Sequence, residues 1–208
     1  MDNNKNFVLN IGRQLGSGGH AIGTILAKEF GIKFYDKEVL DLAAQESGFS
    51  KYFFERDDEH RGFVKSLFNS IIPFTSSGDP YGNQLSSESL FKFQSDAIKK
   101  AAERESCVFV GRCADYVLRD HPRCVNIFIS ANMEDRVARL MQNLQIDAQE
   151  AEKRALEGDD KRASYYNYYS ALTWGEASTY HICINSSVLG LEGTADFLKS
   201  FIMKKLDL

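Results

Sequence analysis

Five short runs of apolar residues divide this chain, and longer polar or helix-patterned segments separate them. Each run is continuous rather than alternating, which is typical of strands that helices cover on both faces. The segments between the runs are long enough for helical crossovers, so the pattern predicts an α/β fold with a parallel sheet. The predicted strands lie at about residues 7–11, 33–36, 107–111, 124–130 and 181–185.

Capping residues beside apolar stripes predict helices between these strands. An apolar stripe at helical spacing follows Asn132, which predicts a helix that Asn132 caps. Asp147 and Glu150 resemble a capping box, so a second and more charged helix is expected, ending near Gly158. Two further helices are predicted, one beginning at Ser86 or Ser87 and the last at Thr194.

The order of these elements predicts one domain with two inserted segments. Residues 73–87 are rich in Pro, Gly, Ser and Asn and predict an exposed, mobile loop within the first insertion. A polar segment between the last two strands forms the second insertion. Two mobile insertions on an α/β core are typical of an enzyme that closes over its substrates.

Composition and charge narrow the class of protein. A length of 208 residues with 43% hydrophobic residues suits a single globular domain. A net charge of −4 disfavours nucleic acid as a partner, because phosphate contacts need a basic surface. No apolar run approaches the roughly 20 residues that span a bilayer, the N-terminus lacks the apolar core of a signal peptide, and the four cysteines show no metal-ligand spacing. We therefore expect a soluble cytoplasmic protein with no membrane or nucleic-acid partner.

A glycine-rich loop carries the first candidate site. It follows a predicted strand and precedes a helical pattern, and this order builds a cradle for phosphate. Backbone N–H groups point into such a turn, and the helix N-terminus adds partial positive charge. The loop and its flank hold more glycines than a structural turn needs. The predicted phosphate-binding residues are Arg13, Gly16, Ser17, Gly18, Gly19, His20 and Ala21.

The loop departs from the P-loop of nucleoside triphosphatases at two positions. In that pattern a lysine and then a Ser or Thr follow the last glycine. Gly19 stands in the place of the lysine, and His20 stands in the place of the hydroxyl residue. The sequence therefore predicts phosphate binding while lacking both side chains that define the ordinary P-loop.

Two charged residues at strand ends are candidates for the same crevice. Asp36 ends the second predicted strand at the carboxyl edge of the sheet, where it would hold a Mg²⁺-bound water or a substrate hydroxyl. The alternative for Asp36 is a helix cap. Arg112 directly follows the third predicted strand, and its guanidinium suits a phosphate. The alternative for Arg112 is a salt bridge to Asp115 or Asp120.

A third group of candidates follows the fourth predicted strand. Arg136 and Arg139 lie one turn apart on a predicted helix, where a solvated face is the alternative to ligand binding. Arg162 precedes a cluster of four tyrosines. These rings suit packing on the core or a homodimer contact better than stacking on a base. The clustered tyrosines are Tyr165, Tyr166, Tyr168 and Tyr169.

With these pieces in order, the chain resembles the cytidylate kinase-like family, a branch related to nucleoside monophosphate kinases. The resemblance extends over almost the whole chain. Five stretches carry it: Arg13 to His20, Phe34 to Glu38, Val110 to Arg112, Asp160 to Tyr166, and Cys183 to Gly190.

The resemblance implies a P-loop kinase fold, a three-layer α/β sandwich with a five-stranded parallel sheet, a helical monophosphate-binding insertion and a lid. It implies a core of residues 1–48, 106–144 and 181–208, an insertion at 49–105 and a lid at 145–180. It also implies that ATP or another nucleoside triphosphate, with Mg²⁺, phosphorylates a nucleoside monophosphate or a similar small-molecule acceptor.

The resemblance assigns roles to the candidate residues. Asp36, Arg112 and Arg162 would be catalytic, and Asp36 would also contact the metal indirectly. Arg112 would hold the acceptor monophosphate. Arg136, Arg139 and Arg162 would neutralise charge on the transferring phosphoryl group, which is most of what this chemistry requires.

The chain departs from authentic cytidylate kinase at its donor site. Gly19 removes a charge-assisted contact of about 1.5–3 kcal/mol, and Val110 stands where that enzyme has an acidic residue. Three cations remain as candidates for the missing charge: Arg13, His20 and Lys37.

These departures leave alternatives to a kinase. One is a catalytically degenerate nucleotide-binding protein that acts as a sensor or binds a partner. A weaker one is a redox switch at Cys113, where the neighbouring Arg112 would lower the pKa of the thiol.

Overall fold

The structure is a computed structural model that describes residues 6–36 and 87–208. The chain divides into two compact units, one of Met1–Asp36 with Lys99–Leu208 and one of Lys37–Ile98. The first unit holds the sheet and the glycine loop.

Helix α5 (Ser87–Arg104) begins in the second unit and supplies all of that unit that the structure describes. Lys37 and most of the predicted mobile loop at 73–87 lie outside the described residues, as does most of the predicted insertion. The division into core, insertion and lid therefore stays a prediction.

The strands of the first unit form the five-stranded parallel sheet that the apolar runs predict. Their order is β2-β3-β1-β4-β5, so β1 lies at the centre. In this register Ile11 of β1 pairs with Val110 on one side and with Ile127 on the other. The strands are β1 (Val8–Arg13), β2 (Lys33–Tyr35), β3 (Cys107–Val110), β4 (Cys124–Ser130) and β5 (Ile182–Asn185).

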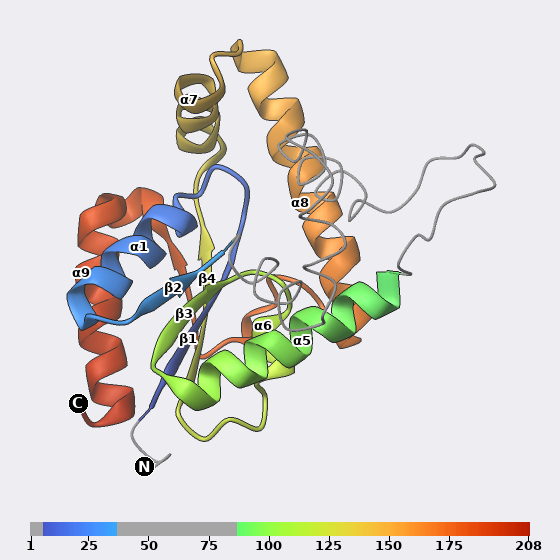
Figure 1. Ribbon diagram of the computed structural model, residues 1–208. Coiled ribbons are helices and arrows are strands. Elements are labelled where there is room, and N and C mark those ends of the chain that lie inside the picture. The colour runs from blue at the N-terminus through green and yellow to red at the C-terminus, as the bar shows by residue number, and fades with distance from the viewer. Residues whose placement is uncertain (1–5, 37–86) are drawn as a thin grey trace, which may run out of the picture. The chain divides into compact units, whose positions relative to one another are not determined.

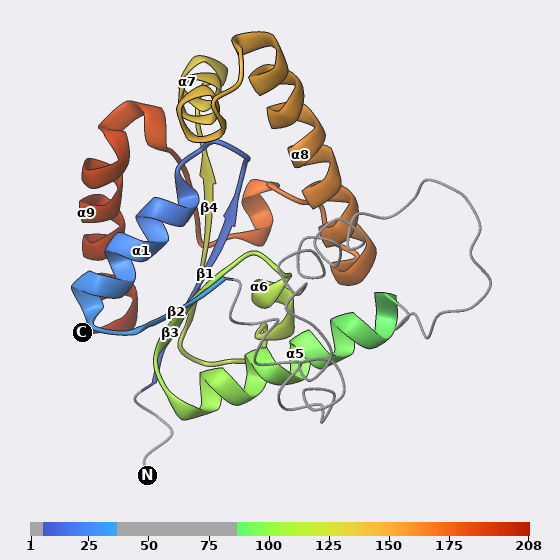
Figure 2. The same cartoon turned by 45° about the horizontal axis from the view of Figure 1, so that its top comes forward.

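Helices cover both faces of this sheet. Helices α1 (Gly19–Phe30) and α9 (Ser186–Leu206) pack against one face, while the short α6 (Ala114–Val117) and α8 (Ala148–Ser170) lie on the other side (Figures 1 and 2). Burial of aliphatic side chains between the sheet and the first pair of helices forms the main core, and this burial is the chief source of the fold's stability. Its fully buried members include Leu9, Ile11, Ile22, Leu26, Ile127, Ile129, Leu198 and Ile202.

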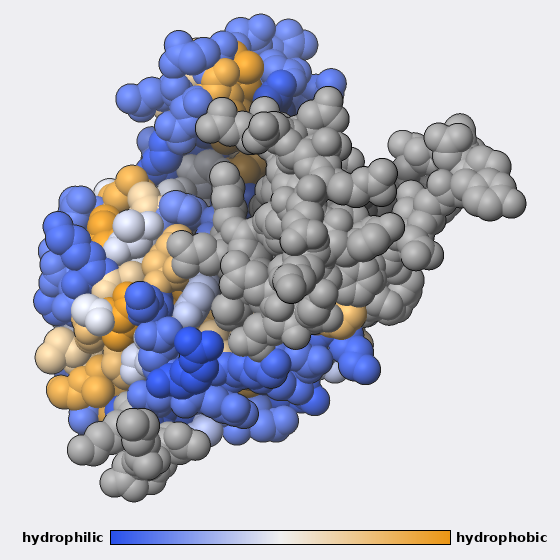
Figure 3. All heavy atoms as spheres, in the orientation of Figure 1, coloured by the Kyte–Doolittle hydropathy of each residue, from blue (hydrophilic) through white to orange (hydrophobic). Residues whose placement is uncertain are grey.

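Helix α7 (Met133–Leu144) and α8 pack side by side beyond the carboxyl ends of the strands. Leu140, Ala151 and Ala155 form a small core of their own between them, and Leu15 of the glycine loop packs against it. Figure 3 shows apolar surface between the otherwise hydrophilic outer sides of the two helices. The glycine loop is therefore packed against the α7–α8 pair as well as against the sheet.

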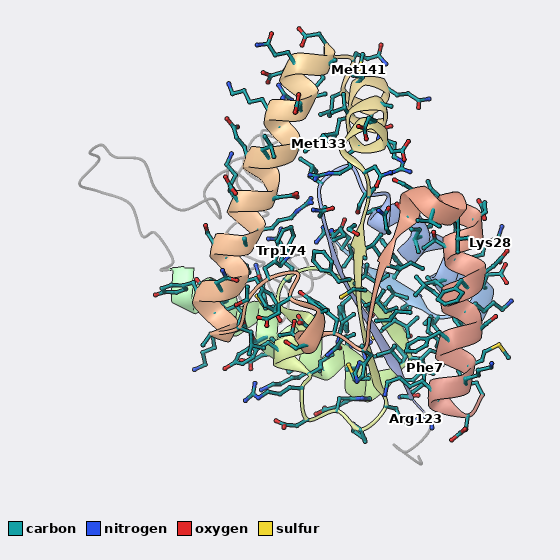
Figure 4. The ribbon with its side chains drawn as sticks, turned by 180° about the vertical axis from the view of Figure 1, so that it is seen from behind. Phe7, Lys28, Arg123, Met133, Met141 and Trp174 are labelled. Atoms are coloured by element: carbon teal, nitrogen blue, oxygen red, sulfur yellow. The ribbon has the colours of Figure 1, made fainter. Side chains whose placement is uncertain are left out.

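The segment between α8 and β5 packs against the sheet. After Ser170 the chain turns through Trp174 and the short 3₁₀ helix η1 (Ala177–Thr179) into β5. Trp174 meets the ring of Phe128 edge-on at 5.1 Å, and Figure 4 shows it between α8 and the sheet. None of the described helices is both long and apolar enough to cross a membrane.

Two predicted helix boundaries are wrong. Helix α8 continues through Gly158 to Ser170, because this glycine serves a close approach rather than a helix end. A Cβ at Gly158 would lie 2.5 Å from Cδ2 of Leu15. The last helix begins at Ser186 instead of Thr194, and Gly190 interrupts it with a φ of 69°. Glycine adopts this backbone conformation without the strain that a Cβ would add.

The predicted caps behave differently from one another. The Asp147 carboxylate accepts a hydrogen bond from the N–H of Glu150 at 2.8 Å, which confirms the predicted start of α8. Asn132 precedes α7 as expected, but its side chain makes no capping bond. Its Oδ1 instead accepts from Nδ2 of Asn185 at 2.9 Å and links the start of α7 to the end of β5.

Candidate phosphate-binding site

The glycine loop joins the end of β1 to the first turn of α1. Gly16 and Gly18 both have a φ of 80°, a conformation that glycine adopts readily and other residues rarely. A Cβ at Gly16 would also lie 2.8 Å from the carbonyl oxygen of Arg136. Glycine is required at 16 by both the backbone conformation and the close approach of α7.

Every main-chain carbonyl of the loop from residue 13 to residue 18 accepts a hydrogen bond. Two are satisfied within the loop and α1, since Ser17 bonds the carbonyl of Gln14 and Ile22 bonds that of Gly18. Side chains from α7, α8 and α9 satisfy the other four. These donors are Arg162 to Arg13 (3.3 Å), Arg136 to Leu15 (2.8 Å), Arg139 to Gly16 (3.0 Å) and Ser186 to Ser17 (2.7 Å).

The N–H groups at the end of the loop and in the first turn of α1 are in the opposite state. Those of Gly18, Gly19, His20 and Ala21 have no acceptor among the residues that the structure describes. Helix α1 also has no side-chain cap and no acidic residue in its first turn. Since a helix N-terminus with open N–H groups attracts anions, the loop presents donors while its acceptors are already used.

Arg136 and Asp159 hold the loop at Leu15. The Arg136 side chain is 4% exposed, and its Nη2 donates to Oδ2 of Asp159 at 2.6 Å. Its Nε donates to the carbonyl of Leu15, while Oδ1 of Asp159 accepts from the Leu15 N–H at 2.7 Å. The pair thus binds both main-chain groups of one loop residue. The predicted phosphate contact of Arg136 stays a prediction, because in this structure its guanidinium bonds to the protein.

Arg13 lies across the floor of the loop. Its side chain runs over Gly19, and a Cβ at Gly111 would collide with its Nη1. Burial lowers the pKa of Arg13 to about 9; the charges of Arg162 and Arg112 act in the same direction, and that of Asp36 opposes them. Three arginines and one carboxylate therefore meet beside the loop.

Arg112 lies in a strained turn after β3. Gly111, Arg112 and Cys113 have φ values of 81°, 63° and 53°, so two residues with a Cβ adopt the left-handed region. Such strain costs about 1–3 kcal/mol per residue and is concentrated at functional sites. Both acids that the sequence offered as alternatives have other partners: Asp115 accepts from the Tyr166 hydroxyl at 2.6 Å, and Oδ2 of Asp120 lies 3.8 Å from Nε of Arg119.

The expected activation of Cys113 is wrong. Burial raises the pKa of this thiol, and the charge of Asp115 raises it further, while Arg112 lowers it by less. The thiolate that a redox switch needs is therefore disfavoured.

Asp36 lies directly after β2, on the same side as the loop. Its Oδ2 is 3.4 Å from Nε2 of His20, whose ring packs edge-on against Phe34. Burial lowers the pKa of both Arg13 and Arg162, and the charge of Asp36 opposes part of that lowering. The structure thus brings together the loop and four of its predicted partners: Asp36, Arg13, Arg112 and Arg162. The alternative of a helix cap concerns the residues after Asp36, which lie outside the described part.

Asp36 has the chemistry that Mg²⁺ prefers, a carboxylate oxygen at the edge of a phosphate site. Gly19 and His20 offer no oxygen side chain at the positions next to it. Within residues 6–36 and 87–208, no group of three or more His, Cys, Asp or Glu side chains could hold a metal ion. Mg²⁺ needs only one or two carboxylates when nucleotide phosphates complete its coordination.

The tyrosine cluster lies on α8, and its members differ in burial. Tyr166 is buried, and its hydroxyl bonds Asp115 while its ring stacks near that of Tyr180. Tyr168 is 69% exposed. Packing on the core thus accounts for Tyr166, as the sequence favoured.

Two residues that hold the loop were missed from the sequence: Asp159 and Ser186. Asp159 is part of a charged helical run, and nothing local marks it as the partner of a loop residue 144 positions away. Ser186 had a signal, since it follows a strand in one of the stretches that carry the family resemblance.

Comparison with known proteins gives one family and several solved structures that share the fold. A model described as the cytidylate kinase-like family matches residues 8–188. An uncharacterized protein from Eubacterium ventriosum ATCC 27560 is 27% identical, with a TM-score of 0.72, and the match covers 95% of this chain and 98% of that one.

Two kinases share the fold at lower identity. A shikimate kinase from Bacteroides thetaiotaomicron is 13% identical, with a TM-score of 0.55 and coverage of 94% and 98% of the two chains. A gluconokinase from Sinorhizobium meliloti 1021 is 11% identical, with a TM-score of 0.56 and coverage of 97% and 94%. The three-layer fold expected from the sequence is confirmed. A search of curated proteins finds no significant match.

Proposed function

The chain belongs to the cytidylate kinase-like family, and on that premise we propose that it transfers a phosphoryl group from ATP, or another nucleoside triphosphate, to a nucleoside monophosphate or a similar small acceptor. Membership of a kinase-like family and the fold shared with small-molecule kinases support nucleotide-dependent phosphotransfer as the reaction class.

One observation carries this proposal: the carbonyls of residues 13 to 18 are all bonded, while the N–H groups of Gly18 to Ala21 are open. Arginines and a serine from three helices hold the carbonyls of residues 13, 15, 16 and 17. The N–H groups of Gly18 to Ala21 have no acceptor among the described residues. Any α-helix begins with four N–H groups that lack a partner in the helix, and here they follow a loop whose carbonyls are all bonded, so this end of α1 presents only donors to a ligand.

The charged residues beside the loop suit phosphoryl transfer. This reaction depends on positioning and on neutralising charge on the transferring group. Arg112, held in its strained turn, is proposed to bind the acceptor's anionic group, and Arg162 to neutralise charge at the transferring phosphoryl. Asp36 is proposed to hold Mg²⁺, directly or through water; when bound, the ion would screen the phosphate charges.

We also propose a cellular location and partners for this protein. Cys107, Cys113, Cys124 and Cys183 are all free thiols, which supports the cytoplasm as the location. The exposed Tyr168 supports a homodimer contact on α8. No nucleic-acid partner is proposed, since the net charge is −4.

The second candidate is a protein that binds nucleotide without catalysis. Gly19 and His20 favour it, because neither supplies the lysine or the hydroxyl of the ordinary P-loop. Both candidates use the same phosphate site, and they differ only in whether a phosphoryl group is transferred.

Turnover with a panel of acceptors tests the two. Purified protein with ATP or GTP and Mg²⁺ is given nucleoside monophosphates and small alcohols, and phosphorylated acceptor is measured. We expect transfer to at least one acceptor, with kcat/KM lowered on the order of 100-fold or more in Asp36→Ala and Arg112→Ala. Arg119→Ala is the matched control, because this arginine is exposed and lies over the Tyr116 ring. Tight nucleotide binding with no transfer to any acceptor would support the second candidate instead.

A further inference from the structure

The chain exchanges two residues of the P-loop pattern. In Gly-x-x-x-x-Gly-Lys-Ser/Thr, the first glycine lies six positions before the lysine. With Gly19 in the place of the lysine, Arg13 takes the place of that first glycine. A cation therefore stands where the pattern has glycine, and a glycine stands where it has the cation.

The exchange is also spatial. A Cβ at Gly19 would lie 2.6 Å from Cβ and 2.9 Å from Cγ of Arg13. Real Cβ atoms are essentially never that close to another atom, so the two positions cannot both carry a long side chain without rearrangement. The stem of Arg13 occupies the space where a side chain at 19 would begin.

The surroundings of Arg13 favour an anion. Its guanidinium lies at Gly111 among the charges of Arg162, Arg112 and Asp36. Among the described residues its side chain donates no hydrogen bond, while its main-chain carbonyl accepts one from Arg162. Arg13 is partly enclosed beside two other cations, and Asp36 offsets only part of their charge, so a further anion is favoured there.

The other two candidates fit less well. His20 is 62% exposed at its side chain and lies beside Asp36. Its imidazole also needs protonation to carry charge. Lys37 lies outside the described residues.

We propose that Arg13 takes the role of the P-loop lysine, its guanidinium binding the outer phosphates of the donor nucleotide. The inference rests on the proposed function and assigns the residue that contacts the donor. A guanidinium presents two parallel N–H groups to phosphate oxygens, a geometry that a lysine ammonium does not match. The glycine at 19 leaves room for that side chain.

Binding of a non-hydrolysable ATP analogue and of AMP, measured by calorimetry, tests this role. We expect Arg13→Ala to weaken binding of the analogue about 10- to 100-fold and to leave AMP nearly unchanged. Gly19→Lys alone should also weaken it, because the new stem meets Arg13. The double variant Arg13→Gly with Gly19→Lys should recover most of the affinity, since it restores the ordinary pattern.

The controls separate this inference from the proposed function. Arg154→Ala is the matched control, because Arg154 lies on the outer side of α8 in an exposed pair with Glu150. If the unaltered protein binds no nucleoside triphosphate, the proposed function fails. If it binds the analogue and Arg13→Ala binds equally well, the role of Arg13 alone is wrong. Thermal unfolding of each ligand-free variant shows whether it folds, and should Arg13→Ala not fold, the double variant alone decides: failure to recover binding overturns the role.

Discussion

Two arginines contact opposite sides of the same loop and use their charge differently. Arg136 is buried, and its guanidinium donates hydrogen bonds to Asp159, Leu15 and Ala155, all within the protein. Arg13 lies beside two like charges and one opposite charge, and its side chain donates no hydrogen bond to any described residue. Arg136 therefore stabilises the conformation of the loop, whereas Arg13 is placed to bind a ligand.

The comparison shows why residue type alone does not reveal a role. Burial of an ion pair is expensive even when both partners are fixed, but removal of one member costs more because it leaves an uncompensated charge. A cation without such a partner reduces the stability of the empty site and gains the most from an anion. Arg136 should thus affect folding, and Arg13 should affect binding.

The largest expected effect comes from Arg136→Ala. It leaves Asp159 buried without its cation and frees the carbonyl of Leu15, so the free energy of unfolding should fall by about 3–5 kcal/mol. Urea denaturation of the ligand-free protein measures this change. A loss below about 1 kcal/mol would show that Arg136 belongs with Arg13 as a ligand-binding residue.

A smaller effect is expected from pH on nucleotide binding. The pKa of Arg13 is lowered to about 9 by burial and by Arg162 and Arg112, against Asp36, and a bound phosphate would raise it. Binding then takes up a proton above that pH, so affinity should fall by up to about tenfold per pH unit as pH rises through about 9.

Calorimetric titration of the unaltered protein and of Arg13→Ala at pH 8 to 10 tests this dependence. The nucleotide phosphates are already ionised in that range, since their last pKa is about 6. The variant should show a weaker dependence on pH. An equal slope in both proteins would assign the titration to another group.

The smallest effect is expected from Arg154→Ala. Arg154 and Glu150 form an exposed pair one turn apart on α8, 2.7 Å between Nε and Oε1. Such pairs contribute about 0.3–0.5 kcal/mol, because water screens them. Urea denaturation should therefore separate Arg154→Ala clearly from Arg136→Ala on the same helix pair. A similar loss in both would mean that general charge on the helix pair, and not the clamp on Leu15, accounts for the effect.

Much of the fold was predictable from short stretches of sequence. Continuous apolar runs placed all five strands within about two residues, because a strand covered on both faces needs an unbroken apolar run. The cap at Asp147 was equally readable, since both of its partners lie within four residues. The helix end predicted near Gly158 was wrong, because glycine is favoured both at a helix end and where another side chain approaches a helix closely.

The sequence predicted which residues form the candidate site, but it did not predict how they contact one another. The sequence by itself determined the loop, its glycines, the strand-end residues Asp36 and Arg112, and the loss of the lysine and hydroxyl positions. Only the tertiary structure decided that Arg136 is a clamp on Leu15, and that Arg13 fills the space above Gly19. The physical reason is that charge partnership depends on distance in space: the bond from Arg136 to Leu15 joins residues 121 positions apart, and no local pattern encodes such a contact.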